Sequence, residues 1–436
     1  MGRIMIKSII IFISAIITLL IISKCSTPEK TITALPYDPP GAIVTTNKEI
    51  TLQHYRTISF SKSGVFASNE FEGARLNDFY QVDDSTFVVE IEPENAPINN
   101  SAWYAFKLWS KEEKDIIIKL NYKDGSHRYR PKLSNDGINW QLLDTTLIII
   151  DTTNSSTSLK LKIGPDTLWV SAQELITSNY FKSWIDELSK LSFAEKKIIG
   201  YSSQGRPIYQ LKFNSSKPSN NYVVVIGRLH PPEVTGSIAL MTFVETIAGE
   251  SDLAKKFRES FNLIVIPLVN PDGVDNGHWR HNANGVDINR DWVEFNQPEP
   301  RAVKNEIERI INEEKGQIKF FIDFHSTTEN VFYNMSVESL KTADLSEENF
   351  LRQKAGLELI NTWLLNLQGK LPDFHVNIVD TLSKPTSPAS DRWLQTEYNV
   401  PAMTYEVSDS ADRELIRKIA KTASIELMQI LLAPRN

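Results

Sequence analysis

The chain has 436 residues, of which 41% are hydrophobic and 23% are charged, and its formal net charge is -7. This length suffices for more than one domain, and the composition is typical of folded proteins with a sizeable apolar core. The negative charge argues against nucleic acid as a partner, because neutralising phosphates needs a basic surface.

The N-terminal segment combines Arg3 and Lys7 with an apolar run over 9–22, closely followed by the only cysteine, Cys25. A basic start before a short apolar stretch is typical of a secretory signal, and a closing cysteine resembles the lipidation site of bacterial lipoproteins. The run is shorter than the ~20 residues of a spanning helix. We therefore expect a signal peptide or lipoprotein signal over 1–25, with a retained helix as the alternative. The rest of the chain would be extracytoplasmic (periplasmic, membrane-anchored or secreted) and would touch a membrane only through this segment or a lipid.

Residues 26–48 contain four prolines without hydrophobic periodicity, which predicts a linker. Short β-rich runs separated by turn signals follow. The runs cover 87–91, 103–109 and 116–120, and turn signals lie at 123–125 and 135–137. Short strands at this spacing predict an antiparallel β-sandwich domain over 49–168.

From 172 to 436 the pattern changes to apolar strands that alternate with amphipathic helices. We expect strands over 222–226, 263–269, 318–324 and 402–407, and helices over 178–191, 233–248, 300–314, 348–367 and 412–432. Nearly continuous apolar strands between helices predict an α/β fold, with a mixed, largely parallel sheet sandwiched by helices.

Polar side chains gather where these strands end. His230 and Glu233 follow the first strand, His325 closes the third, and Glu406 lies at the end of the last. In open α/β sheets ligands bind beyond the carboxyl ends of the strands. Two histidines and a carboxylate suit one catalytic Zn²⁺, because three protein ligands leave a position open for water. Glu406 is then the candidate general base.

The ordered set of motifs resembles the M14 family of zinc carboxypeptidases over about residues 175–432. The matching pieces are HPPE at 230–233, NPDG at 270–273, Arg280, GVDINRDW at 285–292, DFH at 323–325 and TYE at 404–406. Further segments at 71–77, 93–99, 103–106 and 128–131 resemble the β-sandwich that precedes the catalytic domain in the cytosolic-carboxypeptidase-type subgroup. The resemblance implies a zinc carboxypeptidase-like fold and a metallocarboxypeptidase.

The resemblance also implies roles for further residues. Arg280 resembles the arginine that stabilises the oxyanion of the transition state. Asn289 and Arg290 resemble the pair that binds the terminal carboxylate of a peptide substrate, a task that suits the planar guanidinium. Asp287 resembles the carboxylate that orients a zinc-binding histidine, which we expect to be His230.

The sequence leaves open which of two neighbouring residues, Asp391 or Arg392, determines the preferred C-terminal residue of the substrate. Asp391 resembles the floor of the pocket for the terminal side chain and would favour a basic residue, whereas Arg392 pointing inward would favour an acidic one. Family members carry a tyrosine in the loop before the last catalytic strand, and 383–393 contains none. His278 and His281 are candidates for a second metal site, although histidines lining the cleft are the preferred interpretation.

Two other functions remain as alternatives to peptide hydrolysis. One is a zinc amidase or deacylase acting on cell-wall peptides or acyl amino acids, since a fold does not fix its substrate. The other is a catalytically silent peptide-binding module. The presence of Glu406 favours an enzyme over the second alternative.

Overall fold

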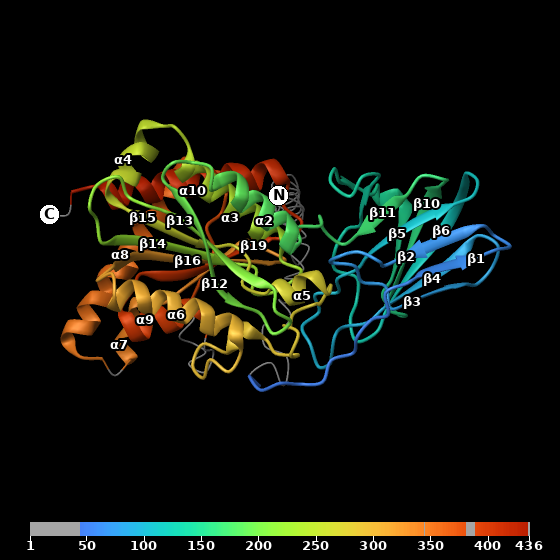
Figure 1. Cartoon of the computed structure of the whole chain (residues 1–436), viewed down its shortest axis with the longest axis horizontal. Helices are drawn as coiled ribbons and strands as arrows, with labels where there is room; N and C mark the ends of the chain where they lie inside the picture. Colours follow the sequence, from blue (N-terminus) through green and yellow to red (C-terminus); the bar gives the residue numbers. More distant parts are fainter. Residues whose placement is uncertain (1–43, 344, 381–388, 435–436) are drawn as a thin grey trace, which may run out of the picture. The chain divides into compact units, whose positions relative to one another are not determined.

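A computed structural model of the protein describes residues 44–343, 345–380 and 389–434, all within the compact unit formed by residues 36–436. The described residues form three β-sheets with flanking helices (Figure 1). The predicted signal segment, 1–25, lies outside the described residues, as does most of the predicted linker. Within the described ranges, no helix has the length and hydropathy needed to cross a membrane.

Two of the sheets form a β-sandwich. The strand order of the first sheet is β1 (Thr57–Phe60), β2 (Val65–Ser68), β5 (Ala105–Ser110), β11 (Leu168–Ser171), β7 (Lys132–Ser134) and β8 (Gln141–Leu142). The order of the second is β3 (Asp78–Gln81), β4 (Thr86–Ile91), β6 (Lys114–Tyr122), β10 (Ser156–Ile163) and β9 (Ile148–Asp151). All neighbours are antiparallel except β4 and β6, which are parallel because the chain passes through β5 of the first sheet between them.

The alternation along β6 explains how the sandwich closes. Ile116, Ile118 and Leu120 are buried while the residues between them are only partly covered, as expected of a strand with one face on a core. Between the sheets, the ring of Phe60 packs on those of Phe79 and Phe87, with centroids 5.5 and 5.7 Å apart. These contacts confirm the predicted sandwich ahead of the α/β region.

The third sheet is mixed with a parallel centre. Its order is β12 (Ala194–Tyr201), β13 (Pro207–Phe213), β15 (Asn262–Ile266), β14 (Asn221–Gly227), β16 (Gln317–Thr327), β19 (Ala402–Ser408), β17 (Val331–Asn334) and β18 (Ile378–Asp380). The central strands β15, β14, β16 and β19 are parallel, which confirms the predicted fold class. The antiparallel pair β12 and β13 was not predicted, because polar residues interrupt both strands.

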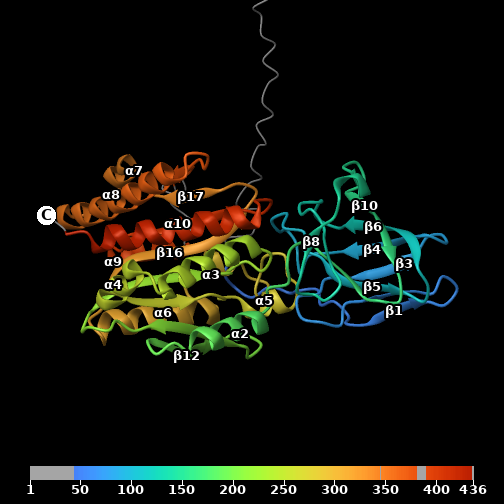
Figure 2. The same cartoon turned by 90° about the horizontal axis from the view of Figure 1, so that it is seen from above.

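Helices cover both faces of this sheet. On one face lie α3 (Val234–Ala248) and α10 (Arg413–Leu432), side by side (Figure 2), with α2 (Ser178–Leu188), α4 (Asp252–Ser260) and α8 (Glu347–Lys370). On the other lie α6 (Pro298–Asn312) and α9 (Ser390–Tyr398). Along β14, Val223 and Val225 face the first group, while Val224 and Ile226 face the second. A strand buried on both faces has to be apolar throughout, which is why the sequence pattern was continuous.

The limits predicted for the two domains, 49–168 and 172–436, stay predictions. The last sandwich strand ends at Ser171 and α2 begins at Ser178. One detail of the sequence interpretation was wrong: 383–393 was taken as a loop throughout, whereas helix α9 begins at Ser390. The short polar first turn of α9 carries little helical periodicity of its own.

A buried ion pair joins the sandwich to the end of β19. Arg128 donates from Nε and Nη2 to Asp409 Oδ2 over 2.9 and 2.7 Å, and from Nη1 to Ser101 Oγ over 2.8 Å. The two charged side chains are 10% and 9% exposed. Burial raises the pKa of Asp409 from 3.8 to about 6, although Arg128 opposes this shift. The folded protein therefore binds this proton more tightly than the unfolded chain does.

This pKa predicts a pH-dependent loss of stability. The contribution of the raised pKa of Asp409 to the free energy of unfolding is fully present below about pH 3.8 and is lost as the pH rises through about 6. The difference between these two pKa values corresponds to about 3 kcal/mol in the free energy of unfolding. We expect the wild type to lose up to this amount relative to Asp409→Asn between pH 4 and pH 7. Urea unfolding of both proteins across this range measures it, with exposed Asp373→Asn as the baseline; a pH-independent difference would contradict the assignment.

Candidate metal centre and catalytic site

The site lies at the carboxyl edge of the parallel strands. Strand β14 ends at Gly227, and the chain then passes through His230 to Glu233, the residue that precedes α3. His325 lies near the end of β16 and is directly paired with Glu406 on the neighbouring strand β19. Because paired residues of parallel strands share a face of the sheet, the topology brings these four side chains to one place.

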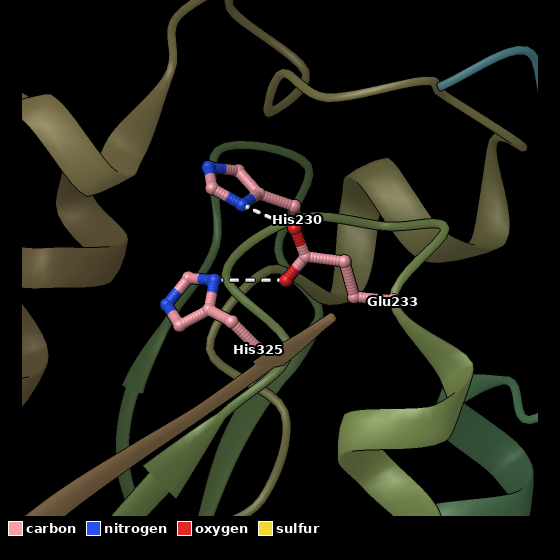
Figure 3. A group of neighbouring side chains, drawn as sticks. All are labelled: His230, Glu233 and His325. Atoms are coloured by element: carbon pink, nitrogen blue, oxygen red, sulfur yellow. Dashed lines mark hydrogen bonds and ion pairs between the residues drawn. The ribbon is translucent and has the colours of Figure 1, made fainter. Parts of the chain in front are cut away.

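Three of them form a compact cluster (Figure 3). His230 Nδ1 lies 2.8 Å from Glu233 Oε1, and His325 Nδ1 lies 2.8 Å from Glu233 Oε2. One potential ligand atom from each residue falls within 4.8 Å of the others, and all three residues are buried. The structure therefore brings together the three predicted ligands. It is the only group of this kind among the described residues.

A second carboxylate lies behind each histidine. Asp287 Oδ1 is 3.0 Å from His230 Nε2, and Asp323 Oδ2 is 3.1 Å from His325 Nε2. The Asp323 carboxylate in turn accepts a 2.5 Å hydrogen bond from Ser390 Oγ. His230 Nε2 is hydrogen-bonded to its carboxylate, whereas His325 Nε2 lies at ion-pair distance from Asp323 without a hydrogen bond, and each Nδ1 faces Glu233. Such partners orient metal-binding histidines and fix their tautomers, so the donor set fits zinc.

Sequence reasoning did not assign Asp323 and Ser390. A signal for Asp323 existed, because residues two apart on a strand project from the same face, and Asp323 is two residues before His325. Nothing in the sequence pointed to Ser390, which reaches Asp323 from the first turn of α9.

The electrostatics of the cluster favour a cation beside Glu233. Burial acts to raise the pKa of Glu233, but the charges of His230 and His325 lower it well below its usual value. Burial acts to lower the pKa of His325, but Asp323 and Glu233 raise it well above its usual value. Both directions describe a site that stabilises positive charge next to a carboxylate, which is the setting a metal ion needs.

Glu406 is the unusual carboxyl of the site. It is buried, and its Oε2 has no hydrogen-bond partner in the part of the chain that the structure describes. Burial raises its pKa, the negative charge of Glu233 raises it further, and His325 and Arg280 oppose these effects, which leaves the pKa at about 8. A carboxyl that exchanges its proton near neutral pH is suited to acid–base catalysis.

Asp287 also organises the residues expected to contact substrate. Its Oδ2 accepts a 2.7 Å hydrogen bond from Arg280 Nε, and its Oδ1 accepts one of 3.0 Å from the backbone N–H of Asn289. Asn289 and Arg290 lie in the short helix η2 (Ile288–Arg290) and are buried. Neither side-chain polar atom of Asn289 has a hydrogen-bond partner among the described residues. A buried amide in this state is costly unless a ligand satisfies it.

Asp391 lies at the edge of the cluster, in the first turn of α9. It is buried, and its Oδ1 accepts the backbone N–H of Arg392 over 2.8 Å. Burial and the nearby charge of Asp323 raise the pKa of Asp391 to about 6. The Arg392 side chain is partly buried, and burial lowers its pKa. Residues 381–388 lie outside the described residues, and so does most of the segment without the family's tyrosine.

His278 and His281 do not form a second metal site within the described residues. Each is buried: His278 Nδ1 lies 3.1 Å from the carbonyl oxygen of His281, and His281 Nδ1 lies 2.6 Å from Asn95 Oδ1. Their contacts hold the loop that carries Arg280 and join it to the sandwich. The expectation that the two histidines line the cleft stays a prediction.

Gly236 sets how closely α3 approaches the site. A Cβ atom at this position would lie 2.5 Å from the carbonyl oxygen of His325. Only glycine therefore lets the first turn of α3, which follows Glu233, pack directly on the backbone of β16.

We expect Gly236→Ala to destabilise the protein by about 1–3 kcal/mol, the usual cost of overpacking a core. The substitution should also weaken metal binding, because α3 and β16 must separate where Glu233 meets His325. Gly369→Ala in α8 is the matched control, since nothing lies within 4 Å of its Cβ position. The control should be neutral or stabilising. Chemical denaturation and zinc titration measure both effects, and equal behaviour of the two variants would contradict this account.

The fold and the cluster define a protein of the metallohydrolase class, with two histidines and a glutamate at the edge of an α/β sheet. A model of the zinc carboxypeptidase family (Peptidase_M14) matches residues 181–426. The chain belongs to this family, which confirms the predicted resemblance and the metallocarboxypeptidase class. The family implies zinc and peptide substrates with a free C-terminus.

Relatives with the name cytosolic carboxypeptidase match part of the chain. Cytosolic carboxypeptidase 6 of mouse is 28% identical over 189 residues, which cover 41% of this chain and 34% of the relative. The human protein of the same name is 29% identical over 191 residues, covering 41% and 36%. The chain thus spans about a third of the length of these curated relatives.

Solved structures show the same fold over most of the chain. A metallo-carboxypeptidase from Burkholderia cenocepacia matches with a TM-score of 0.68 and 17% identity, covering 84% of this chain and 98% of that one. A metallo-carboxypeptidase from Pseudomonas aeruginosa, in complex with (2-guanidinoethylmercapto)succinic acid, matches with a TM-score of 0.68 and 16% identity over the same shares. At these identities the likeness concerns the fold.

The location predicted from the N-terminal segment is wrong. The curated relatives are named cytosolic carboxypeptidases, and this name conflicts with the predicted periplasmic, lipoprotein or secreted location. The predicted signal peptide, lipid anchor at Cys25 and membrane contact lose their support with it. The inference failed because basic residues before a short apolar run form a pattern of composition alone, without a specific chemistry to test it.

Proposed function

We propose that the protein is a zinc-dependent carboxypeptidase that releases the C-terminal residue of peptides. One observation carries the proposal: in a chain of the zinc carboxypeptidase family, a buried carboxyl with a raised pKa, Glu406, lies beside a buried His-Glu-His cluster. Perturbed pKa values next to a candidate metal cluster are typical of catalytic sites.

In this proposal, His230 Nδ1, the Glu233 carboxylate and His325 Nδ1 hold one zinc ion per chain. When bound, zinc supplies a Lewis acid that polarises the scissile carbonyl and lowers the pKa of water. Asp287 and Asp323 keep the two imidazoles oriented through their Nε2 atoms. The protein thereby contributes a fixed geometry that needs no rearrangement during the reaction.

Glu406 moves the proton in this proposal. Its carboxylate accepts the proton of the attacking water as the new carbon–oxygen bond forms. It then delivers that proton to the leaving amine as the peptide carbon–nitrogen bond breaks. Burial and the charge of Glu233 raise the pKa of Glu406 in the metal-free protein, and a bound cation next to Glu233 would lower it toward the range in which the carboxylate accepts a proton.

Arg280, Asn289 and Arg290 would bind the substrate. The Arg280 guanidinium, held by Asp287 through Nε, would stabilise the negative charge that develops on the carbonyl oxygen. The terminal carboxylate of the peptide would satisfy the Asn289 amide and pair with the Arg290 guanidinium. A requirement for a free terminal carboxylate makes the enzyme an exopeptidase.

For the terminal side chain we propose a basic preference through Asp391. The Asp391 carboxyl is buried close to Asp323, and a cationic side chain would relieve the unfavourable contact of two acidic groups. Arg392 contacting the substrate instead would reverse the preference to acidic residues.

Kinetics on blocked dipeptides that end in basic, acidic and apolar residues test this assignment. We expect the basic terminus to be preferred, and Asp391→Ala to lower kcat/KM for it by about tenfold or more, which corresponds to about 1.4 kcal/mol. The apolar substrates should change far less. An acidic preference that Arg392→Ala abolishes would show that Arg392 forms the pocket.

Zinc content and residue release by the full chain test the proposed function itself. One zinc per chain and release that depends on it would support a carboxypeptidase. Bound zinc without release from any peptide would favour the amidase or deacylase alternative, with acyl amino acids and cell-wall peptides as the next substrates. Metal binding without any turnover would favour a peptide-binding module.

A further inference from the structure

A carboxylate of the sandwich reaches into the loop that carries Arg280. Glu94, which follows β4, is fully buried. Its Oε2 accepts the backbone N–H of Trp279 over 2.7 Å, and its Oε1 accepts those of Arg280 and His281 over 3.0 and 2.7 Å. One side chain thus satisfies three consecutive backbone donors of a segment almost two hundred residues away in the sequence.

Other sandwich residues hold the same loop. Trp279 Nε1 donates to the carbonyl oxygen of Trp103 over 3.2 Å, and Asn95 Oδ1 lies 2.6 Å from His281 Nδ1. Gly277 has a φ of 64°, and a Cβ atom there would lie 2.2 Å from the carbonyl oxygen of Ala74. The conformation of the loop therefore depends on its contacts with the sandwich. Among the described residues of the sandwich, Glu94 is the only carboxylate that accepts hydrogen bonds from consecutive backbone N–H groups of this loop.

A short series of hydrogen bonds connects this anchor to the metal cluster. The backbone of Arg280 is held by Glu94, and its side chain donates from Nε to Asp287 Oδ2 over 2.7 Å. Asp287 Oδ1 lies 3.0 Å from His230 Nε2. A shift of the Arg280 backbone would therefore displace its guanidinium relative to the cluster, while Asp287 could keep its contact with His230.

The charge of Glu94 strengthens this anchor. Burial acts to raise the pKa of Glu94, but the charges of His278, His281 and Arg75 and the backbone N–H of His281 lower it to about 2. The carboxylate stays ionised, and hydrogen bonds to a charged acceptor are roughly twice as strong as neutral ones. Burying a charge is costly unless it is paired and hydrogen-bonded. The buried Glu94 carboxylate is hydrogen-bonded to the loop that carries Arg280, so its specific function is to hold this loop in place.

We propose that Glu94 is a positioning residue for the carboxypeptidase reaction, by which the sandwich fixes the backbone of residues 279–281 and so aims the Arg280 guanidinium at the substrate carbonyl. The inference rests on the proposed function. It makes the sandwich a part of the active centre and not only a support for the catalytic domain. It also predicts that the effect of Glu94 acts through Arg280 and leaves the zinc ligands in place.

The isosteric change Glu94→Gln tests the proposal in the full, zinc-loaded chain. The side-chain NH2 group of the glutamine would then face a backbone N–H group and could not accept its hydrogen bond. The loop would therefore lose part of its attachment to the sandwich. We expect kcat to fall by about 10²-fold, the scale of a misplaced catalytic group, with KM and zinc content nearly unchanged. Glu174→Gln is the matched control, because Glu174 accepts two 2.8 Å hydrogen bonds from Arg413 of α10, away from the loop. The control should lower stability but leave kcat within about twofold.

A double-mutant cycle with Arg280→Ala separates positioning from a general loss of structure. If Glu94 acts through Arg280, adding Glu94→Gln to Arg280→Ala should lower kcat by less than about threefold further. Should Glu94→Gln fail to fold, Glu94→Asp keeps the charge but draws the carboxylate back by one methylene, and it should show the same loss of kcat. An equal loss of kcat in both backgrounds would overturn the inference.

Amide hydrogen exchange provides a readout that needs no activity. Exchange at residues 279–281 should accelerate in Glu94→Gln and stay unchanged in Glu174→Gln, while the zinc titration stays unchanged in both. Unchanged protection at these three amides would overturn the inference whatever the kinetics show. A wild type that binds zinc but hydrolyses no peptide would overturn the proposed function and, with it, the catalytic part of the inference. An active wild type with an unimpaired Glu94→Gln variant would overturn the inference alone.

Discussion

Glu406→Gln is expected to lower kcat for peptide hydrolysis by about 10²–10⁴-fold, the range that general acid–base catalysis contributes. Glutamine keeps the size of the side chain but no longer accepts the proton of the attacking water. Zinc content should stay at one per chain, because Glu406 is not among the three clustered ligand residues. Residue release and metal analysis on the same preparation measure both quantities.

Stability distinguishes this result from damage to the fold. Burial raises the pKa of Glu406 to about 8, so the folded protein resists ionising this group. Removing the charge should therefore leave the zinc-free protein at pH 8 no less stable than the wild type, or more stable. Glu397→Gln, at an exposed position of α9, is the control with full activity expected. Activity of Glu406→Gln within tenfold of the wild type would rule out Glu406 as the base.

Much of the site could be predicted because it follows from the sheet. The strands β14, β16 and β19 are buried on both faces, so their apolar runs are nearly continuous in the sequence and their ends are easy to locate. The polar residues at those ends, His230, His325 and Glu406, then meet because parallel strands finish at the same edge. The resemblance to a family added Arg280 and Asp287, which lie in a loop that no periodicity marks.

The remaining parts depend on contacts between distant segments. Ser390 contacts Asp323 from the first turn of a helix that has little apolar periodicity, and Glu94 contacts the Arg280 loop from the sandwich. The sequence around Ser390 and around Glu94 does not indicate which residue each of them contacts. The pair of β12 and β13 was missed for a different reason: β12 forms the edge of the sheet and has no buried residue, and neither strand has a continuous apolar pattern.

Zinc removal is the second change with a large expected effect. Chelation should abolish residue release, and one equivalent of zinc should restore it, because the Lewis acid of the proposed reaction is lost with the ion. It should also lower the melting temperature. A ligand at a hundredfold excess over its Kd stabilises a protein by about 2.7 kcal/mol, which corresponds to several degrees in a chain of this size. Calorimetry of the loaded and stripped protein measures the difference.

Glu233→Gln should reproduce the loss in the presence of zinc. Glu233 is the member of the cluster that contacts both histidines, so its amide would remove the anionic ligand and oppose one histidine with an N–H group. Loss of an outer partner alone costs about 10–100-fold in metal affinity, and the loss of a direct ligand should exceed that. Glu245→Gln on the exposed side of α3 is the matched control, with unchanged zinc affinity expected. If Glu233→Gln bound zinc as tightly as the wild type, the ion would have to be held elsewhere, and the proposed centre at His230, Glu233 and His325 would be wrong.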